Sequence, residues 1–347
     1  GVNRRGVTTA QLLAEANNVE LVTLFSPEHG LQGKLDIPEI ADGHDSQTGV
    51  KIFSLYGKSR KPTAQSLEDI DALVFDIQDI GARFYTYIST MGHAMQAASE
   101  QEIEFVVLDR PNPINGVDIA GPILDPGRES FVGFHPIPIR HGSTVGELAR
   151  LFQHERKWEL ELTVIPVEGW QRTDFFDQTG LLWVNPSPNM RCMTQALLYP
   201  GIGLLEMTNL SVGRGTDTPF EVIGAPWLAG IEFAAQLNAL QLPGVGFVPI
   251  RFTPETSKFQ GELCGGICIL ITDRARFESV RTGLEIARQL RLAYPEAWEM
   301  DRYDRLLSSK RTWKSIREAK DVRDIEASHR AGLERFRARR APWLLYE

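Results

Sequence analysis

The chain has 347 residues, of which 42% are hydrophobic and 24% are charged. This composition is typical of a globular protein with a full core, and the length suggests two domains. The 45 acidic residues outnumber the 37 basic ones and give a net charge of -8, which argues against nucleic acid as a partner because its binders usually carry a basic face. The sequence also has no apolar run long enough to span a bilayer.

The first half of the chain alternates helical and strand patterns. We expect helix 8–18, strand 19–25, strand 71–77, helix 83–101, strand 104–109, helix 144–155 and strand 161–167. Strands that alternate with helices form right-handed parallel crossovers. Residues 1–193 are therefore predicted to be a Rossmann-like domain with a doubly wound parallel sheet. A dinucleotide cofactor is not expected, because no G-x-G-x-x-G motif follows a strand.

The second half changes character. Glycines cluster in the stretch "YPGIGLLEMTNLSVGRGTDTPFEVIGAPW", short strands are predicted at 246–254 and 264–273, and a long helix is predicted at 274–292. The segment 325–347 has the pattern of an amphipathic helix that packs back on the body. Residues 194–347 are therefore predicted to be a smaller α+β domain.

The three cysteines, Cys192, Cys264 and Cys268, do not form a metal-binding pattern. The last two have the spacing C-x3-C, with no His or Cys pair nearby, whereas zinc sites have characteristic ligand pairs. We interpret these cysteines as small core residues.

Polar clusters follow three of the predicted strands. In an open parallel sheet, ligands bind in the crevice beyond the carboxyl ends of the strands. The clusters are Ser26-Pro27-Glu28-His29, then Asp76-Ile77-Gln78-Asp79 followed by Arg83 and Tyr85, and finally Asp109-Arg110-Pro111-Asn112. One crevice is thus expected to collect carboxylates, arginines and a histidine. The alternative is that these loops are polar because they are solvated, with Asp109 and Arg110 paired.

Paired carboxylates beside aromatic and amide groups suit glycoside hydrolysis. One protonated acid assists the leaving oxygen, and a second group stabilises or attacks the oxocarbenium-like centre. Glu28 fits the acid best, because it follows a proline at the edge of an apolar strand, where desolvation favours the protonated form. A metal-dependent hydrolase is the competing interpretation. Its candidate ligands, which lack H-x-x-x-H and H-x-H spacing, are Glu28, His29, His44, Asp45, Asp76 and Asp79.

The glycine-rich stretch is a second candidate region. It places Glu206, Asn209, Arg214 and Glu221 in an irregular segment, where backbone amides and a guanidinium can meet a sugar carboxylate. The alternative is a structural turn network in which Glu206 pairs with Arg214. His141 and Asn189 lie in further polar stretches and are weaker candidates.

Long motifs along nearly the whole chain resemble those of one known family, the exo-β-N-acetylmuramidases (NamZ-type glycoside hydrolases), formerly a domain of unknown function. In order, they are "LFSPEHGLQG", "VFDIQDIGARFYTY", "VLDRPNPING", "GPILD", "PIRHGSTVGELA", "NPSPNM" and the glycine-rich stretch quoted above. So many long motifs in one order exclude a chance similarity, although a motif as short as "PEHG" alone would prove little.

The resemblance implies a cleft between the two domains, with Glu28 at its centre. It also implies exo-cleavage of β-1,4-linked N-acetylmuramic acid from the non-reducing ends of peptidoglycan fragments, which are then the expected partners. Related chains begin with another strand and a Thr-Asn-x-Thr-Gly-like turn, of which only Gly1 and Val2 remain here, so the first strand is expected to be missing. The family's cell-wall substrate implies a secreted or periplasmic protein, although no export signal is visible. The oligomeric state is not indicated.

We therefore expect Glu28, Asp79 and Glu206 to be catalytic, with no metal and no cofactor. The expected substrate-binding residues are His29, Arg83, Tyr85, Arg110, Asn112, His141, Asn189, Asn209, Arg214 and Glu221. Arg83, Arg110 and Arg214 are the candidates to hold the 3-O-lactyl carboxylate of N-acetylmuramic acid. Arg214 is favoured, because Gly213 and Gly215 let the backbone approach a ligand, and Arg83 is the next candidate. The alternative function is a non-catalytic protein that binds peptidoglycan fragments in the same cleft.

Overall fold

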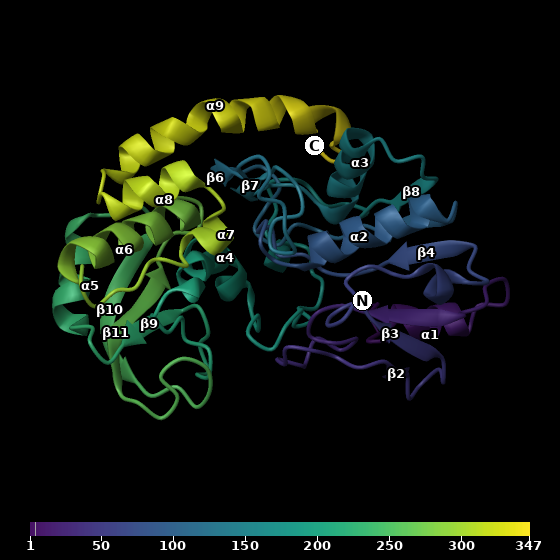
Figure 1. Ribbon diagram of the computed structural model, residues 1–347, viewed down its shortest axis with the longest axis horizontal. Helices are drawn as coiled ribbons and strands as arrows, with labels where there is room; N and C mark the ends of the chain where they lie inside the picture. The colour runs from purple at the N-terminus through teal and green to yellow at the C-terminus, as the bar shows by residue number, and fades with distance from the viewer. Residues whose placement is uncertain (4) are drawn as a thin grey trace.

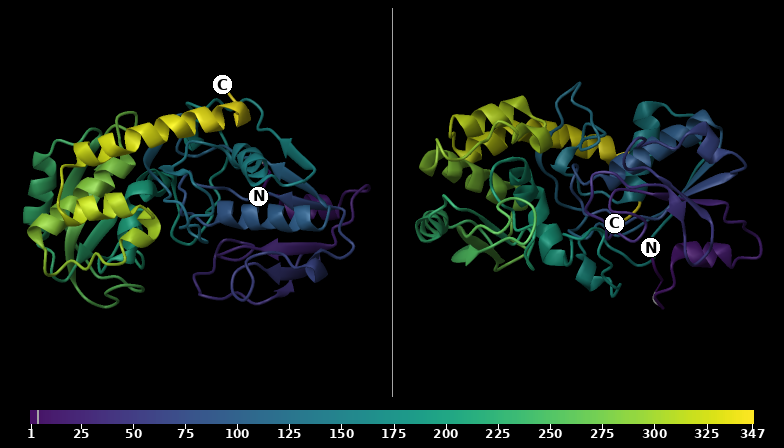
Figure 2. Two further views of the ribbon diagram at one scale, coloured as in Figure 1. Left: turned by 45° about the horizontal axis from the view of Figure 1, so that its top comes forward. Right: turned by 60° about the horizontal axis from the view of Figure 1, so that its bottom comes forward.

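The computed structural model describes residues 1–3 and 5–347, and Figure 1 shows two lobes lying side by side. The N-terminal lobe comprises the elements from α1 (Thr9–Ala14) to η2 (Phe176–Gln178). The C-terminal lobe comprises those from α4 (Met193–Ile202) to α8 (Lys310–Arg317). The long helix α9 (Val322–Arg340) crosses from the second lobe back to the first (Figures 1 and 2). No helix among the described residues is long and apolar enough to cross a membrane.

The N-terminal lobe contains two three-stranded sheets. In the first, β1 (Thr23–Ser26) runs parallel to β3 (Lys51–Ser54), and β2 (Gly43–His44) runs antiparallel to β3. In the second, β5 (Glu104–Leu108) lies between β4 (Ala72–Phe75) and β8 (Leu162–Ile165), and the three strands are parallel. The prediction of parallel strands in the first half is confirmed, although β3 was not predicted and the strands are divided between two sheets.

The strand predicted at 19–25 differs from the observed β1. The observed strand begins at Thr23, and the side chains of Val19 and Val22 are 45% and 43% exposed. In the described residues, β1 has a hydrogen-bonded neighbour, β3, on one side. The strand is therefore shorter than predicted, and β1 lies at the edge of its sheet in the described part of the chain.

Helices connect the parallel strands as predicted. α3 (Val145–Arg156) begins at a capping box in which Thr144 and Glu147 each bond the other's backbone. α2 (Tyr87–Glu100) begins four residues later than expected, because the amide of Arg83 donates to Ile139 instead of entering the helix (2.8 Å). Ile139 belongs to β7 (Pro138–Arg140), which pairs with β6 (Ala120–Ile123), and the 3₁₀ turn η1 (Ala64–Leu67) precedes β4.

The C-terminal lobe has an antiparallel sheet packed against helices, as the α+β prediction states. The sheet has the order β10-β11-β9. Between α4 and α8, the C-terminal lobe contains η3 (Gly203–Met207), β9 (Val222–Ala225), α5 (Gly230–Ala239), β10 (Val245–Phe252), β11 (Cys264–Ile271), α6 (Ser279–Ala293) and α7 (Asp304–Leu307). The helix α6 starts five residues later than predicted.

α4 and α6 cross at two glycines. A Cβ atom added to Gly283 would lie 2.4 Å from the carbonyl oxygen of Gly201, so the two backbones touch and neither position tolerates a side chain. Tyr199 lies two residues before Gly201 and is 7% exposed. The close crossing therefore fixes the end of α4 that carries Tyr199.

α9 contributes to the cores of both lobes. Val322 and Ile325, near its start, belong to the core that contains the C-terminal sheet. Phe336, near its end, belongs to the core formed by α2, α3 and β5. After η4 (Ala341–Trp343), the hydroxyl of Tyr346 donates to the carboxylate of Asp109. The last part of the chain therefore packs on the N-terminal lobe.

Candidate active site

Glu28 lies directly after β1, in a turn with an uncommon backbone conformation. His29 and Gly30 have φ angles of 69° and 77°, a region that glycine adopts readily and other residues rarely. The ring Nδ1 of His29 lies 2.7 Å from the carbonyl oxygen of Leu35. This hydrogen bond spans the turn and helps to set the direction in which Glu28 leaves the strand.

The start of α2 holds Glu28 from a second side. The hydroxyl of Thr86 donates a hydrogen bond to the Glu28 carboxylate. The hydroxyl of Tyr87 donates to the carbonyl oxygen of Pro186 and lies 3.3 Å from the carbonyl oxygen of Glu28. Burial, followed by the negative charge of Glu28, raises the pKa of Tyr87 above its usual value. Tyr87 therefore stays protonated and remains a hydrogen-bond donor.

Strand register brings Tyr56 beside Glu28. Ser26 of β1 is paired with Ser54 of β3, and the amide of Leu55 donates to the Ser26 carbonyl oxygen at 2.8 Å. Glu28 and Tyr56 each lie two residues beyond this pair, at the carboxyl ends of adjacent strands. Burial, followed by the neighbouring Glu28 carboxylate, raises the pKa of Tyr56 to about 12.

Asp79 forms a buried pair with His141. Asp79 is 4% exposed and His141 is fully buried. The Asp79 Oδ2 accepts from the amide of Gly81 at 2.7 Å and lies 3.1 Å from the Nε2 of His141. Because the amide of Ser143 donates to the Nδ1 of His141 at 3.2 Å, Nε2 carries the proton and donates to Asp79. The Oδ1 of Asp79 is buried and has no hydrogen-bond partner in the described part of the chain.

A second charged cluster joins the two lobes around Arg214. Its guanidinium contacts the carboxylate of Glu206 and lies 3.4 Å from the carboxylate of Asp36. Asp36 also accepts from the side-chain amide of Asn189 at 2.9 Å, and the ammonium of Lys258 donates to the Glu206 carbonyl oxygen. Burial lowers the pKa of Arg214, but the neighbouring acids more than offset it, so the pKa is raised overall.

A row of aromatic rings connects Glu28 with Arg214. Ring centroids are 5.0 Å apart for Tyr87 and Tyr85, 5.8 Å for Tyr85 and Tyr199, and 4.8 Å for Tyr199 and Phe220. The guanidinium carbon of Arg214 lies 5.5 Å from the centroid of Phe220. Contacts therefore run without interruption from the acid of the N-terminal lobe to the cation of the C-terminal lobe.

Tyr199 lies among the charges of both lobes. Its pKa is raised by burial first and then by Glu206, with further contributions from Glu28 and Asp79, while Arg214 opposes them. The hydroxyl of Tyr85 is also buried, without a hydrogen-bond partner among the described residues. A polar ligand at this point would meet acids, phenols and a guanidinium.

Of the predicted site residues, eight lie in the groups just described, around Glu28, Asp79, Tyr199 and Arg214, and five lie elsewhere. The eight are Glu28, His29, Asp79, Tyr85, His141, Asn189, Glu206 and Arg214. The five are Arg83, Arg110, Asn112, Asn209 and Glu221.

Arg83 is fully buried and points away from the acids. Its Nη1 donates to the carbonyl oxygens of Pro122 and Ile137 at 2.9 and 3.0 Å, and its Nη2 donates to those of Leu306 and Leu307 at 3.1 and 2.8 Å. The guanidinium therefore links the N-terminal lobe to α7, and both of its terminal nitrogens are already in use.

The other four residues that lie elsewhere have local partners. Arg110 Nε donates to the carboxylate of Asp76 at 2.7 Å, and Asn112 donates to the carbonyl oxygen of Ser143 at 3.0 Å. Asn209 donates to the carbonyl oxygen of Ala297 at 2.8 Å. Glu221 accepts from the side-chain amide of Gln195 at 3.1 Å. These contacts stabilise loops around the site.

Seven residues of the site were not among the predicted ones: Asp36, Tyr56, Thr86, Tyr87, Tyr199, Phe220 and Lys258. Tyr199 opens the glycine-rich stretch, so its place in that motif was an available signal. Asp36 lies in an exposed loop with no distinguishing pattern. Its position depends on contacts with Asn189 and Arg214 that are remote in sequence.

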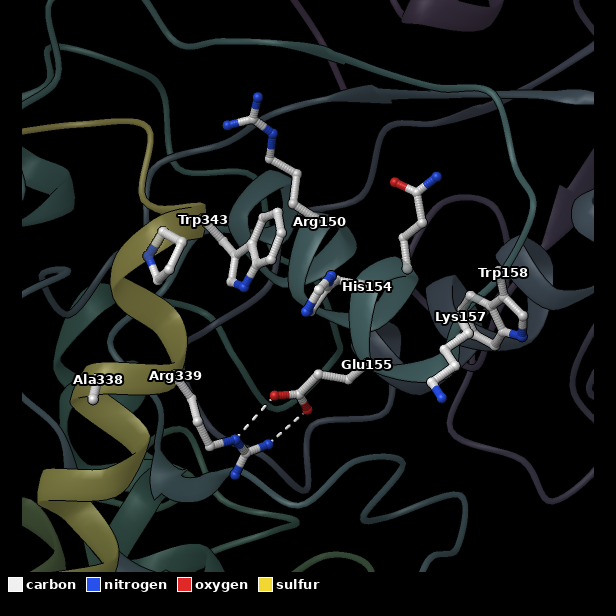
Figure 3. A pocket seen from close by; sticks show the side chains of 10 residues that line it. Arg150, His154, Glu155, Lys157, Trp158, Ala338, Arg339 and Trp343 are labelled. Atoms are coloured by element: carbon white, nitrogen blue, oxygen red, sulfur yellow. Dashed lines mark hydrogen bonds and ion pairs between the residues drawn. The ribbon is translucent and has the colours of Figure 1, made fainter.

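A groove lies away from this site, between α3 and the end of α9 (Figure 3). It has a volume of about 840 Å³. Its residues include Arg150, His154, Trp158 and Trp343, and its carboxylate, Glu155, is held by two nitrogens of Arg339 at 2.6 and 2.9 Å. This groove thus has cations and aromatic rings but lacks the acids gathered around Tyr199. Within residues 1–3 and 5–347, no three His, Cys, Asp or Glu side chains are close enough to hold a metal ion.

Acids, phenols and an arginine from the two lobes lie close together around Tyr199, which makes this group the candidate active site. Comparison with known proteins identifies the family of the chain. The family model described as "Exo-beta-N-acetylmuramidase NamZ, N-terminal" matches residues 1–194, and its C-terminal counterpart matches residues 197–346. The chain belongs to the exo-β-N-acetylmuramidase NamZ family.

Individual relatives support the same assignment. The chain is 45% identical over 350 residues to the peptidoglycan β-N-acetylmuramidase NamZ of Bacillus subtilis (strain 168), covering 100% of this chain and 84% of that protein. Crystal structures of two DUF1343 family proteins from Bacteroides fragilis NCTC 9343 are also similar. One has a TM-score of 0.92 and 37% identity, covering 100% of this chain and 92% of the other. The second has a TM-score of 0.74 and 34% identity, covering 95% and 87%.

Proposed function

We propose that this protein is an exo-acting glycoside hydrolase that releases N-acetylmuramic acid from the non-reducing ends of β-1,4-linked peptidoglycan fragments. The observation that carries this proposal is the aromatic row between Glu28 and the Arg214 cluster. It joins a candidate general acid in one lobe to a candidate carboxylate-binding cation in the other. Family membership and the relative from Bacillus subtilis support the same activity.

Glu28 is the general acid of this proposal. It delivers a proton to the glycosidic oxygen as the bond to the released sugar breaks. The Thr86 hydroxyl fixes the carboxyl group, so the acid is oriented before the substrate arrives. Asp79 is the second acid, because its free Oδ1 can stabilise positive charge at the anomeric carbon while His141 holds its Oδ2.

Arg214 binds the lactyl carboxylate that distinguishes N-acetylmuramic acid from N-acetylglucosamine. Glu206 contacts its Nε and Asp36 lies near its Nη1, whereas Nη2 has no hydrogen-bond partner within the described residues. The two acids fix the guanidinium and leave Nη2 to donate a charge-assisted hydrogen bond to a carboxylate ligand. Glu206 thus positions Arg214. We assign Arg83 a structural role, because both of its terminal nitrogens donate to backbone carbonyl oxygens.

We further propose that the substrate occupies a cleft between the lobes, and that the N-terminal lobe is Rossmann-like. The loops after β1 and β4 both reach the site, with Glu28 after the first strand and Asp79 after the second. Such convergence of carboxyl ends is the arrangement that binds ligands in doubly wound sheets. A secreted or periplasmic location follows from the proposed cell-wall substrate.

Release of free N-acetylmuramic acid from the disaccharide N-acetylmuramyl-β-1,4-N-acetylglucosamine tests the function. Chromatography and mass spectrometry of the products should show both monosaccharides in equal amounts. A non-catalytic binding protein would show affinity for the disaccharide in calorimetry but would form no product, and that outcome would overturn the proposal.

A further inference from the structure

Glu28 has neighbours in two directions. Tyr87, the end of the aromatic row that leads to Arg214, contacts it from α2. Tyr56 flanks it from the neighbouring strand β3, through the register of Ser26 with Ser54. The proposed function assigns roles to residues on the first side, toward Arg214, but assigns none to the residues around Tyr56.

Beyond Tyr56 lies a group that we call the Arg60 cluster, made of Tyr56, Arg60 and Phe131. The ring centroids of Tyr56 and Phe131 are 6.2 Å apart. The guanidinium carbon of Arg60 lies 4.1 Å from the centroid of Phe131 and 6.0 Å from that of Tyr56. Stacking on these rings holds the long Arg60 side chain in one place while its charge stays available.

Arg60 differs from the other arginines around the site because it has no carboxylate partner among the described residues. It is exposed, whereas Arg110 is bound to Asp76 and Arg214 is bound to Glu206. The adjacent Lys61 is also paired, with Glu100 at 2.6 Å. An oriented cation without an internal partner is suited to an external anion.

Resting on the proposed function, we propose that the Arg60 cluster binds the departing part of the substrate, with Arg60 on a carboxylate of that fragment. The acid Glu28 must lie beside the oxygen that joins the released sugar to the rest of the chain. If Arg214 holds the released sugar, the fragment that leaves extends from Glu28 in the other direction. Tyr56 then faces the first sugar of the leaving fragment, and Arg60 lies near the acidic groups further along it.

Two substrates and two variants test this inference. The substrates are the disaccharide, whose leaving sugar is neutral, and the corresponding tetrasaccharide, whose leaving fragment carries a second lactyl carboxylate. Arg60→Gln should lower the ratio of kcat/KM for the tetrasaccharide over the disaccharide by about fivefold to tenfold, on the scale of one exposed charge-assisted hydrogen bond. Lys58→Gln is the matched control, because Lys58 is exposed in the same loop and has no partner among the described residues.

The ratio of kcat/KM for the tetrasaccharide over the disaccharide shows whether Arg60 binds the leaving fragment or has only a structural role. A ratio unchanged by Arg60→Gln, or lowered equally by Lys58→Gln, would overturn the inference. High salt should reduce the effect, since it screens exposed charges. If the wild-type protein releases no sugar from either substrate, the proposed function fails instead. The cluster is then tested by tetrasaccharide affinity, which should still fall with Arg60→Gln and stay unchanged with Lys58→Gln.

Discussion

Asp36 and Arg214 lie 3.4 Å apart across the two lobes, although 178 residues separate them in the chain. The same Asp36 accepts from Asn189, so one exposed acid connects two loops of the N-terminal lobe with the glycine-rich segment of the C-terminal lobe. The position of Arg214 therefore depends on both lobes being in place.

Replacement of Arg214 should impair muramic-acid substrates selectively. We expect Arg214→Met to lower kcat/KM for them by roughly 2 to 3 kcal/mol, the scale of a lost charge-assisted pair, and to leave residual cleavage of N-acetylglucosaminides nearly unchanged. Steady-state kinetics on both substrates measures this difference. The control is Arg251→Met, because Arg251 is exposed on β10. An equal fall on both substrates would make Arg214 structural.

Glu28→Gln should abolish turnover while leaving the fold intact. Glutamine keeps the shape of the side chain and can still accept from Thr86, but it cannot deliver a proton, so we expect at least about a hundredfold loss of kcat. Circular dichroism and disaccharide affinity should remain close to wild type. The exposed Glu168 gives a matched control, Glu168→Gln. Turnover near the wild-type rate in Glu28→Gln would exclude Glu28 as the acid.

Exhaustive chelation should leave activity unchanged, because the proposal uses the acids for proton transfer and sugar binding. The measurement is disaccharide hydrolysis before and after dialysis against a chelator. Loss of activity, with recovery on addition of zinc or manganese, would support the metal-dependent alternative instead.

Arg83→Met should cost stability rather than specificity. It removes four hydrogen bonds to buried carbonyl groups in both lobes, and we expect the free energy of unfolding to fall by about 3 kcal/mol or more. Denaturant unfolding measures this change. If stability stayed the same while the KM for muramic-acid substrates rose, Arg83 would bind substrate after all.

Mild acid should destabilise the protein through His329. This residue is 8% exposed, and burial, followed by the charge of Arg311, lowers its pKa from 6.5 to about 4. Between these values the unfolded chain binds a proton that the folded chain does not, so stability falls as the pH drops from 6.5 to 4. The loss is on the order of 3 kcal/mol when integrated over that range.

His329→Gln should flatten this part of the pH profile. Ser309 donates to the Thr312 hydroxyl, which then donates to the Nε2 of His329 at 2.8 Å, and glutamine can replace that acceptor without titrating. Unfolding at pH 7.5 and pH 5 compares the wild type with this variant and with His44→Gln, whose imidazole is exposed. A pH dependence identical in all three proteins would contradict the assignment.

Local signals made much of the fold predictable. The helix at 145–156 follows from a capping box within four residues, and the parallel strands follow from short apolar runs between helices. The grouping of Glu28 with Asp79 was also predictable, since both lie after parallel strands. These features depend on neighbouring residues or on a general rule about sheets.

The remainder depends on contacts that sequence patterns do not carry. Arg83 has the appearance of a site residue, yet its carbonyl partners in α7 lie more than 200 residues away in the chain. Tyr199 resembles an ordinary core aromatic until Glu28 and Glu206 are placed on either side of it. The start of β1 at Thr23 likewise depends on where it pairs with β3, so Val22 could not be recognised from its apolar neighbours as lying outside the strand.

The path of α9 has a consequence for folding during synthesis. Phe336 belongs to the core around α2, α3 and β5, and Tyr346 donates to the buried Asp109, which directly follows β5. These partners are translated more than 180 residues after the strand that they cover. The surface of the N-terminal lobe that Phe336 covers therefore stays open until α9 has been made, and during that interval it is available to chaperones.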